Sequence, residues 1–230
     1  MKKYGAVLLI GLLAGCQSED KITNACIDCG KFQIEHLTTQ KVFIADAVDQ
    51  TVLASLKKNI ATTQKITGSF DQQIKQYYEN FKNLKDASLS FSIHPSLITS
   101  PQFLTVQLQT QGFLGGAHGM TEKKYLVFDH QKQIFLDDIV LPQQKQALEK
   151  LVYLQYQQWV ISQQLADRLD DYEQAWPFKM THNFYFTSEG LVLQYNEYEI
   201  APYSAGMPIF TIKYADLKNI LKPEYEPKTI

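Results

Sequence analysis

The chain has 230 residues, 45% of them hydrophobic, with 22 basic and 24 acidic side chains and a formal net charge of −2. This length is sufficient for one sizeable domain or two small ones. The slight excess of acidic side chains leaves no basic stripe, which argues against binding to nucleic acid.

The first fifteen residues have the pattern of an export signal. Lys2 and Lys3 precede an apolar run, Ala6–Leu13, that is too short to span a bilayer. The run ends in Leu-Ala-Gly-Cys, which resembles a bacterial lipoprotein cleavage site. That resemblance implies that Cys16 becomes the first mature residue, carries acyl chains such as palmitate, and holds the protein at a membrane by a lipid anchor alone. The alternative is an ordinary secretory signal with a chance cysteine.

The residues after the cysteine bear on the location of the protein. Gln17 and Ser18 stand where an aspartate usually retains a Gram-negative lipoprotein in the inner membrane. If the source is Gram-negative, we therefore expect an outer-membrane lipoprotein that faces the periplasm. Removal of residues 1–15 takes away Lys2 and Lys3 and leaves a net charge of about −4, which is too small to select a partner.

The remaining cysteines, Cys26 and Cys29, have a C-x-x-C spacing inside a polar segment, residues 16–30, that we expect to be a tether. A disulfide is the default interpretation in an exported protein. A redox motif would normally open a helix after a strand, and a zinc site would need two further ligands. Redox activity, metal binding and free thiols nevertheless stay open as alternatives.

The segment from residue 31 to 86 predicts extended chain followed by two helices. Residues 31–44 suit a strand pair, and apolar residues then recur at helical spacing over residues 46–60 and 70–84. Ser69 is a candidate N-cap for the second helix.

The segment from residue 87 to 141 predicts β-strands joined by turns. Apolar and polar residues alternate along it, as a half-buried antiparallel sheet requires. Pro95 and Pro101 are expected to bracket a turn. Four of the eight glycines after residue 15 fall within residues 112–119, which indicates positive φ angles or a close approach to the backbone. The expected strands are 89–93, 103–111, 125–128 and 134–136.

The C-terminal third predicts a long helix and then a hairpin. Pro142 opens a helical pattern that continues to residue 172, and residues 183–195 read as two strands around a tight turn. A last strand at residues 208–212 and a short helix at 214–221 precede a polar tail, residues 222–230. The whole pattern predicts an α+β fold, with helices packed on one face of a mostly antiparallel β-sheet.

Residues 197–206, between the hairpin and the last strand, form a loop longer than a hairpin needs. Pro202 fixes its own φ and Gly206 permits a backbone angle that other residues avoid. Tyr198 and Tyr203 are large and stiff with a polar tip, and such residues suit a recognition surface. They could equally be core residues of an irregular crossover.

Several motifs in the second half of the chain carry a resemblance to a known family. They are Gly115-Gly-Ala-His-Gly119, Tyr125-Leu-Val-Phe-Asp129, Phe135-Leu-Asp-Asp-Ile139, Gly190-Leu-Val-Leu-Gln-Tyr195 and Tyr198-Glu-Ile-Ala-Pro-Tyr-Ser-Ala-Gly206. Together they resemble the extracytoplasmic DUF3298 domain, here residues 87–221. The helical region before them, residues 31–86, resembles its partner domain DUF4163. The family includes RsiV-like anti-sigma factors, whose extracellular part binds lysozyme, and modules attached to peptidoglycan deacetylases.

The resemblance implies a lipid-anchored binding protein of the cell envelope, whose partner is a lysozyme-like muramidase or another envelope protein. Loops 115–119 and 197–206 would meet on one exposed surface and contact that partner. Glu197 and Glu199 could meet a basic rim, although Glu199 could equally bond backbone amides, and His118 could be a buried structural histidine. The candidate contact residues are Gly116, His118, Glu197, Tyr198, Glu199, Pro202 and Tyr203.

Two alternatives remain open at this stage. A peptidoglycan-binding module would use Trp159, Trp176 and the tyrosines as stacking platforms. A hydrolase would use His118 as general base, oriented by Glu199 or Asp138. However, no serine or cysteine stands in a nucleophile motif and the five histidines lack metal-ligand spacing, so we expect no catalytic residue, metal or cofactor.

Overall fold

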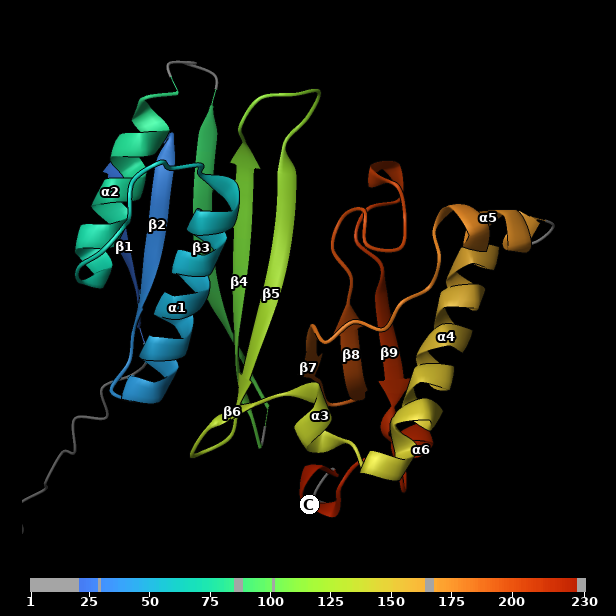
Figure 1. Cartoon of the computed structure of the whole chain (residues 1–230). Helices are drawn as coiled ribbons and strands as arrows, with labels where there is room; N and C mark the ends of the chain where they lie inside the picture. Colours follow the sequence, from blue (N-terminus) through green and yellow to red (C-terminus); the bar gives the residue numbers. More distant parts are fainter. Residues whose placement is uncertain (1–20, 29, 85–88, 101, 164–167, 227–230) are drawn as a thin grey trace, which may run out of the picture.

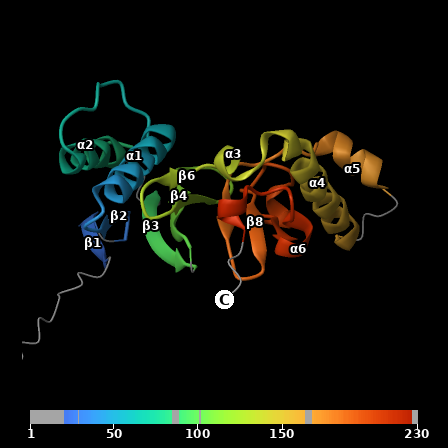
Figure 2. The ribbon, with the colours of Figure 1, turned by 90° about the horizontal axis from the view of Figure 1, so that it is seen from below.

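The computed structural model describes residues 21–28, 30–84, 89–100, 102–163 and 168–226 (Figure 1). The strands form a six-stranded sheet in the order β1-β2-β3-β4-β5-β6 and a three-stranded sheet in the order β7-β8-β9. Helices α1 and α2 cover one face of the first sheet, and α4 lies beside the second sheet at the other end of the molecule (Figure 2). The α+β prediction is confirmed.

The first sheet is antiparallel except between β2 and β3. Parallel neighbours need a crossover connection, which α1 and α2 supply. The strands are β1 (Lys21–Asp28), β2 (Phe32–Thr38), β3 (Ser90–Thr99), β4 (Leu104–Phe113), β5 (Met120–Phe128) and β6 (Gln133–Ile134). The two helices are α1 (Val42–Asn59) and α2 (Phe70–Lys82).

Helix α1 presents a buried stripe to the sheet, because its apolar residues recur every fourth position. The stripe consists of Ile44, Val48, Val52 and Leu56. The helix starts four residues earlier than the pattern predicted, since Phe43 is part of the helix and packs its ring on Phe128 in an edge contact at 5.9 Å.

Helix α2 begins where the sequence predicted. Ser69 Oγ accepts a hydrogen bond from the Gln72 amide, and the Gln72 side chain accepts one from the Ser69 amide, which together form a capping box. The buried residues of α2 are Ile74, Tyr77 and Phe81. They complete a core between the helices and the inner face of β2, β3 and β4.

Several local predictions were wrong. The strand pair expected within residues 31–44 is a single strand, β2, followed by the start of α1. Residues 21–28 of the expected tether form strand β1, because the neighbouring strand β2 offers its free backbone edge for pairing. Pro95 does not bound a turn but lies within β3, beyond the residues of β3 that pair with β2. The expected polar tail includes Tyr225, which is buried and stacks on Phe103 at 6.2 Å.

The second half of the chain builds the smaller sheet and its own core. The 3-10 turn η1 (Pro142–Gln144) leads into α4 (Lys145–Ser162), as Pro142 predicted. The helix expected to reach residue 172 is in fact two helices, with α5 (Leu169–Ala175) separate. The other elements are α3 (Leu136–Ile139), β7 (Phe184–Phe186), β8 (Gly190–Gln194), η3 (Tyr203–Ala205), β9 (Ile209–Lys213), α6 (Tyr214–Leu217) and η4 (Pro223–Tyr225).

Side chains from the second half satisfy the open edge of β5. Every second amide of β5 points away from β4, and no strand among the described residues pairs with that edge before Val127. The Thr121 amide donates to Glu197 Oε2 (3.2 Å), and the Lys123 amide donates to Asn196 Oδ1 (2.7 Å). The Tyr125 amide donates to Asn183 Oδ1 (2.9 Å), and Asn183 Nδ2 returns a bond to the Lys123 carbonyl (2.8 Å). These side chains act in place of a paired strand.

Aromatic pairs reinforce the same junction. Tyr125 stacks on Tyr185 with ring centroids 4.4 Å apart, and Phe103 stacks on Phe186 at 4.3 Å. Burial, with a smaller contribution from Tyr185, raises the pKa of Tyr125 to about 12. The neutral Tyr125 hydroxyl donates to Gln107 Oε1 at 2.9 Å. The two sheets are therefore joined by stacked rings as well as by hydrogen bonds.

Among the helices that the structure describes, none combines the length and the apolar character needed to cross a membrane.

Replacing Ser69 with alanine removes the side-chain half of the capping box, so we expect a loss of about 1 kcal/mol in the free energy of unfolding. Chemical denaturation would measure it. Ser188→Ala is the matched control, because Ser188 is an exposed serine outside any helix. An equal effect of the two substitutions would contradict the role of the cap.

Replacing Asn183 with alanine should cost more, about 2 kcal/mol or more, because it leaves the buried Tyr125 amide and the part-buried Lys123 carbonyl of β5 without their partner. Asn183 is only 6% exposed. Asn83→Ala, at an exposed helix end, is the control and should change the unfolding free energy by less than about 0.5 kcal/mol. A similar small change at Asn183 would show that the β5 edge does not depend on this side chain.

Candidate functional site

Three aromatic side chains from two distant loops form one stack at an exposed surface. His118 comes from the β4–β5 loop, and Tyr198 and Tyr203 come from the segment between β8 and β9. The rings of His118 and Tyr203 are 3.7 Å apart and nearly parallel, and Tyr198 lies 6.3 Å from His118 and 6.1 Å from Tyr203. Tyr198 is 44% exposed and Tyr203 is 40% exposed. The predicted meeting of the two loops is confirmed.

Both ring nitrogens of His118 have partners. Nδ1 lies 2.8 Å from the Gly119 carbonyl oxygen, which can only accept, so Nδ1 carries a hydrogen. In the neutral imidazole, Nε2 is then the acceptor for the Tyr198 hydroxyl at 3.0 Å. These two bonds fix the ring plane of His118, which is half-buried rather than enclosed in the core.

The glycine-rich segment left open positive φ angles or a close approach to the backbone, and both loops contain glycines with positive φ. Gly115 and Gly116 have φ of 97° and 107°, and Gly206 has φ of 74°. Gly116 is exposed, and an added Cβ there would meet nothing within 4 Å. Glycine at 115 and 116 therefore serves the loop conformation and not a close contact.

Tyr198 also has a positive φ, of 65°, which is uncommon for a bulky residue and costs on the order of 1 kcal/mol or more. The Glu199 amide donates to the Asn196 carbonyl at 3.2 Å, so Tyr198 stands inside a tight turn. The sequence predicted Tyr198 as a site residue, but it did not predict the positive φ of its backbone. Since the ring is exposed, the strained position does not serve core packing.

Pro202 prepares the position of Tyr203. It has φ of −67° and precedes the 3-10 turn η3, in which the Ala205 amide donates to the Pro202 carbonyl at 3.0 Å. The predicted stiffening of this loop by proline is thus present in the geometry.

The two glutamates of the loop have partners within the chain. Glu197 Oε2 accepts from the Thr121 amide, and Glu199 Oε2 accepts from the Asn196 amide at 2.8 Å. The sequence left open that Glu199 bonds a backbone amide, and the structure confirms this bond. Both side chains are half-buried, and each also lines a pocket of about 260 Å³ next to His118.

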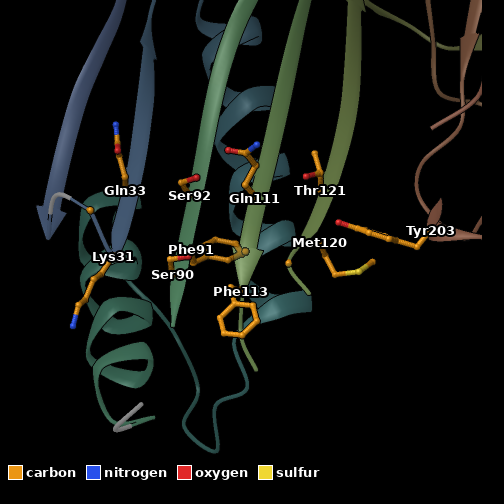
Figure 3. A pocket seen from close by; sticks show the side chains of 13 residues that line it. Lys31, Gln33, Ser90, Phe91, Ser92, Gln111, Phe113, Met120, Thr121 and Tyr203 are labelled. Atoms are coloured by element: carbon orange, nitrogen blue, oxygen red, sulfur yellow. The ribbon is translucent and has the colours of Figure 1, made fainter. Parts of the chain in front are cut away.

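A second pocket, of about 390 Å³, lies on the other side of the β4–β5 hairpin and has Tyr203 in its wall (Figure 3). Met120, which is 45% exposed, lines both pockets. Met120 could not be predicted as a site residue, since a single methionine at a strand end has no distinguishing pattern in the sequence. The aromatic stack therefore stands between two hollows.

Of the other predicted site residues, Trp176 reaches the aromatic stack, whereas Asp138 and Trp159 lie away from it. Asp138 lies in α3 near the opposite end of β5 from His118 (Figure 1), and its carboxylate accepts from the Phe135 amide at 3.1 Å. Trp159 packs against the core of the second half, whereas Trp176 lies 6.4 Å from Tyr198. Cys16, Cys29 and the side chain of Cys26 lie outside the described residues, so lipidation and the disulfide stay predictions.

Within the described residues, no group of three or more histidine, cysteine, aspartate or glutamate side chains is placed to hold a metal ion.

Part of the chain matches a known family model, and most of it is similar to one curated protein. Residues 132–215 match the model of a family described as "Protein of unknown function (DUF3298)". Over 192 residues the chain is 26% identical to the peptidoglycan-N-acetylmuramic acid deacetylase PdaC of Bacillus subtilis. That match covers 81% of this chain and 39% of PdaC, so the chain spans well under half the length of this relative.

Two solved structures have a similar fold. A DUF3298 family protein from Pseudomonas aeruginosa has a TM-score of 0.72 at 23% identity, covering 92% of this chain and 96% of that one. A DUF3298 family member from Bacteroides fragilis has a TM-score of 0.59 at 20% identity, covering 90% and 92% of the two chains. At these identities the likeness shows the fold.

The family match lies inside the predicted range of 87–221 and includes loop 197–206, but it does not reach loop 115–119. The DUF4163 resemblance of residues 31–86 stays a prediction. Residues 132–215 therefore resemble the DUF3298 family, and both similar structures are described as members of that family.

Proposed function

We propose that this chain is a lipid-anchored binding protein of the cell envelope, which recognises a lysozyme-like muramidase or another envelope protein through loops 115–119 and 197–206. The observation that carries the proposal is the exposed ring stack of His118, Tyr198 and Tyr203. Aromatic side chains of this kind dominate binding energy at protein interfaces.

The stack is already rigid before any partner arrives. His118 is held at both ring nitrogens, Tyr198 by a hydroxyl bond and a tight turn, and Tyr203 by Pro202. A surface whose side chains are ordered in the free protein loses little entropy on binding. The strained backbone of Tyr198 also agrees with a functional role, because such strain concentrates at binding sites.

The charge next to the stack suits a basic partner. Glu197, Glu199 and Glu122 line the pocket beside His118, and Glu122 is paired with Lys58 at 2.8 Å. The two loop carboxylates are fixed by backbone amides, so a cationic rim on the partner would meet an ordered negative surface. Complementary charge of this kind speeds association more than it adds affinity.

The cell-wall setting of the proposal rests on two further observations. The chain begins with a pattern that resembles a lipoprotein signal, and its relative PdaC is named as a peptidoglycan deacetylase. A protein partner that acts on peptidoglycan fits that setting.

The geometry gives less support to the two alternatives, a peptidoglycan-binding module and a hydrolase. Trp159, one of the two stacking platforms expected for a peptidoglycan module, packs against the core. In a hydrolase, Nε2 of His118 would face a nucleophile, but its described partner is the Tyr198 hydroxyl. Glu199 and Asp138 both bond backbone amides and neither is a described partner of His118.

Binding of hen egg-white lysozyme to the purified full chain, measured by biolayer interferometry, tests the proposal. We expect saturable binding that Tyr203→Ala weakens at least about tenfold, because loss of a central aromatic anchor typically costs 2 kcal/mol or more. The matched control is Phe135→Ala, which removes a 58% exposed ring near the other end of β5 and should leave affinity unchanged.

Absence of binding would contradict the muramidase assignment, and crosslinking in intact cells would then identify the neighbouring protein. If a His118→Ala, Tyr203→Ala double variant kept full affinity for that protein, the assignment of the loops would be wrong.

A further inference from the structure

The outer face of the six-stranded sheet, which faces away from α1 and α2, carries the 390 Å³ pocket as a trough across four strands (Figure 3). Gln33 of β2 pairs with Ser92 of β3, Ser92 with Gln111 of β4, and Gln111 with Thr121 of β5. Because paired residues in a sheet share a face, these four side chains form one polar row. At about 4.8 Å per strand, the row spans roughly 14 Å.

A polar outer face is common for a sheet that helices cover on one side only. What distinguishes the trough on this face is how few charged residues line it. Lys31 is the single charged residue among the thirteen described residues that line the trough. In typical soluble domains about 25% of all residues are charged. A polar hollow with so few charged side chains is therefore not explained by the need for solubility.

The row has hydrogen-bonding capacity to spare. In the described part of the chain, the side chains of Ser92, Gln111 and Thr121 make no hydrogen bond to another residue. Gln33 Nε2 donates to Glu35 Oε1 at 3.0 Å, which orients the amide and leaves its carbonyl oxygen free to accept. Amide and hydroxyl groups together offer both donors and acceptors along the whole row.

Aromatic rings complete the lining. Tyr203 extends from the second half of the molecule toward β5, and Phe113 lies at the end of β4 (Figure 3). The ring of Tyr203 is fixed by its stack on His118. Planar amides, hydroxyls and fixed rings form the combination that recognises a ligand with hydroxyl groups at its edges and C–H groups on its faces.

We propose that this trough binds a short, uncharged oligosaccharide, a second ligand that shares Tyr203 with the protein partner assigned to the aromatic stack. Its hydroxyl or acetamido groups bond Gln33, Ser92, Gln111 and Thr121, and a sugar face packs on Tyr203. The volume of about 390 Å³ lies in the range of roughly 300–1,000 Å³ that is usual for ligand pockets. The trough spans several strands, which suits a short chain of sugars better than a single one.

Isothermal titration of the full chain with chitotetraose and, separately, with cellotetraose tests this site. Both probes are neutral tetrasaccharides, and they differ in the acetamido group, so the comparison identifies which sugar type the trough takes. We expect saturable binding of at least one, weakened about tenfold by Gln111→Ala through loss of one or two hydrogen bonds.

Gln109→Ala is the matched control. Gln109 lies on the same strand and the same face, two residues from Gln111, but it does not line the trough. Its replacement should leave oligosaccharide affinity unchanged. Gln111 is exposed, so thermal unfolding should show that Gln111→Ala retains the fold.

Failure of both tetrasaccharides to bind would overturn the proposal, as would equal losses in Gln109→Ala and Gln111→Ala. The result is separable from the protein-partner proposal, because Gln111→Ala should leave lysozyme binding unchanged and Tyr203→Ala should weaken both.

Discussion

The outer edge of β5 is where the two halves of the molecule join. A strand whose edge amides face another packed element needs a partner for each of them, since an unpaired buried amide costs a large part of a domain's stability. Here the partners are side chains, Asn183, Asn196 and Glu197, that bond three alternate residues of β5. Because these side chains flank the β7–β8 hairpin, their spacing fixes where that hairpin stands relative to the first sheet.

The position of the recognition loops follows from this junction. β5 starts just after His118, and Asn196 and Glu197 directly precede Tyr198. Each bond to β5 therefore brings the start of loop 197–206 toward the end of loop 115–119. Where the two loops meet, His118 makes a hydrogen bond to the Tyr198 hydroxyl and stacks on the Tyr203 ring. The β4–β5 hairpin separates a pocket lined by three glutamates from a trough in which Lys31 is the single charged lining residue.

Local features could be predicted from the sequence where a strong period or a special residue was present. The stripe of α2 and its Ser69 cap, the β7–β8 hairpin, and the positive φ of Gly115, Gly116 and Gly206 were all predicted in this way. The convergence of His118 with Tyr203 was predicted from the two conspicuous loops. The function of that surface was not, because aromatic residues in loops serve packing and binding alike.

Other features depend on contacts that no local pattern reveals. Strand β1 is polar and forms only because β2 offers an edge for pairing. The order of strands along the chain also does not reveal whether they form one sheet or two. The bonds of Asn183 and Asn196 to β5 cannot be predicted from their positions beside a hairpin. Their one signal in the sequence is symmetry, since they stand just outside the two strands of the same hairpin.

The central claim is that side chains of the second half replace a strand along β5. The most direct measurement is hydrogen exchange at the Thr121, Lys123 and Tyr125 amides, resolved by NMR. Exchange at Lys123 and Tyr125 as slow as in the interior of β4, with Lys123 becoming fast in Asn196→Ala, is the result that we predict. Exchange as fast as at the exposed Ala117 would contradict it, because the β5 edge would then be open to solvent.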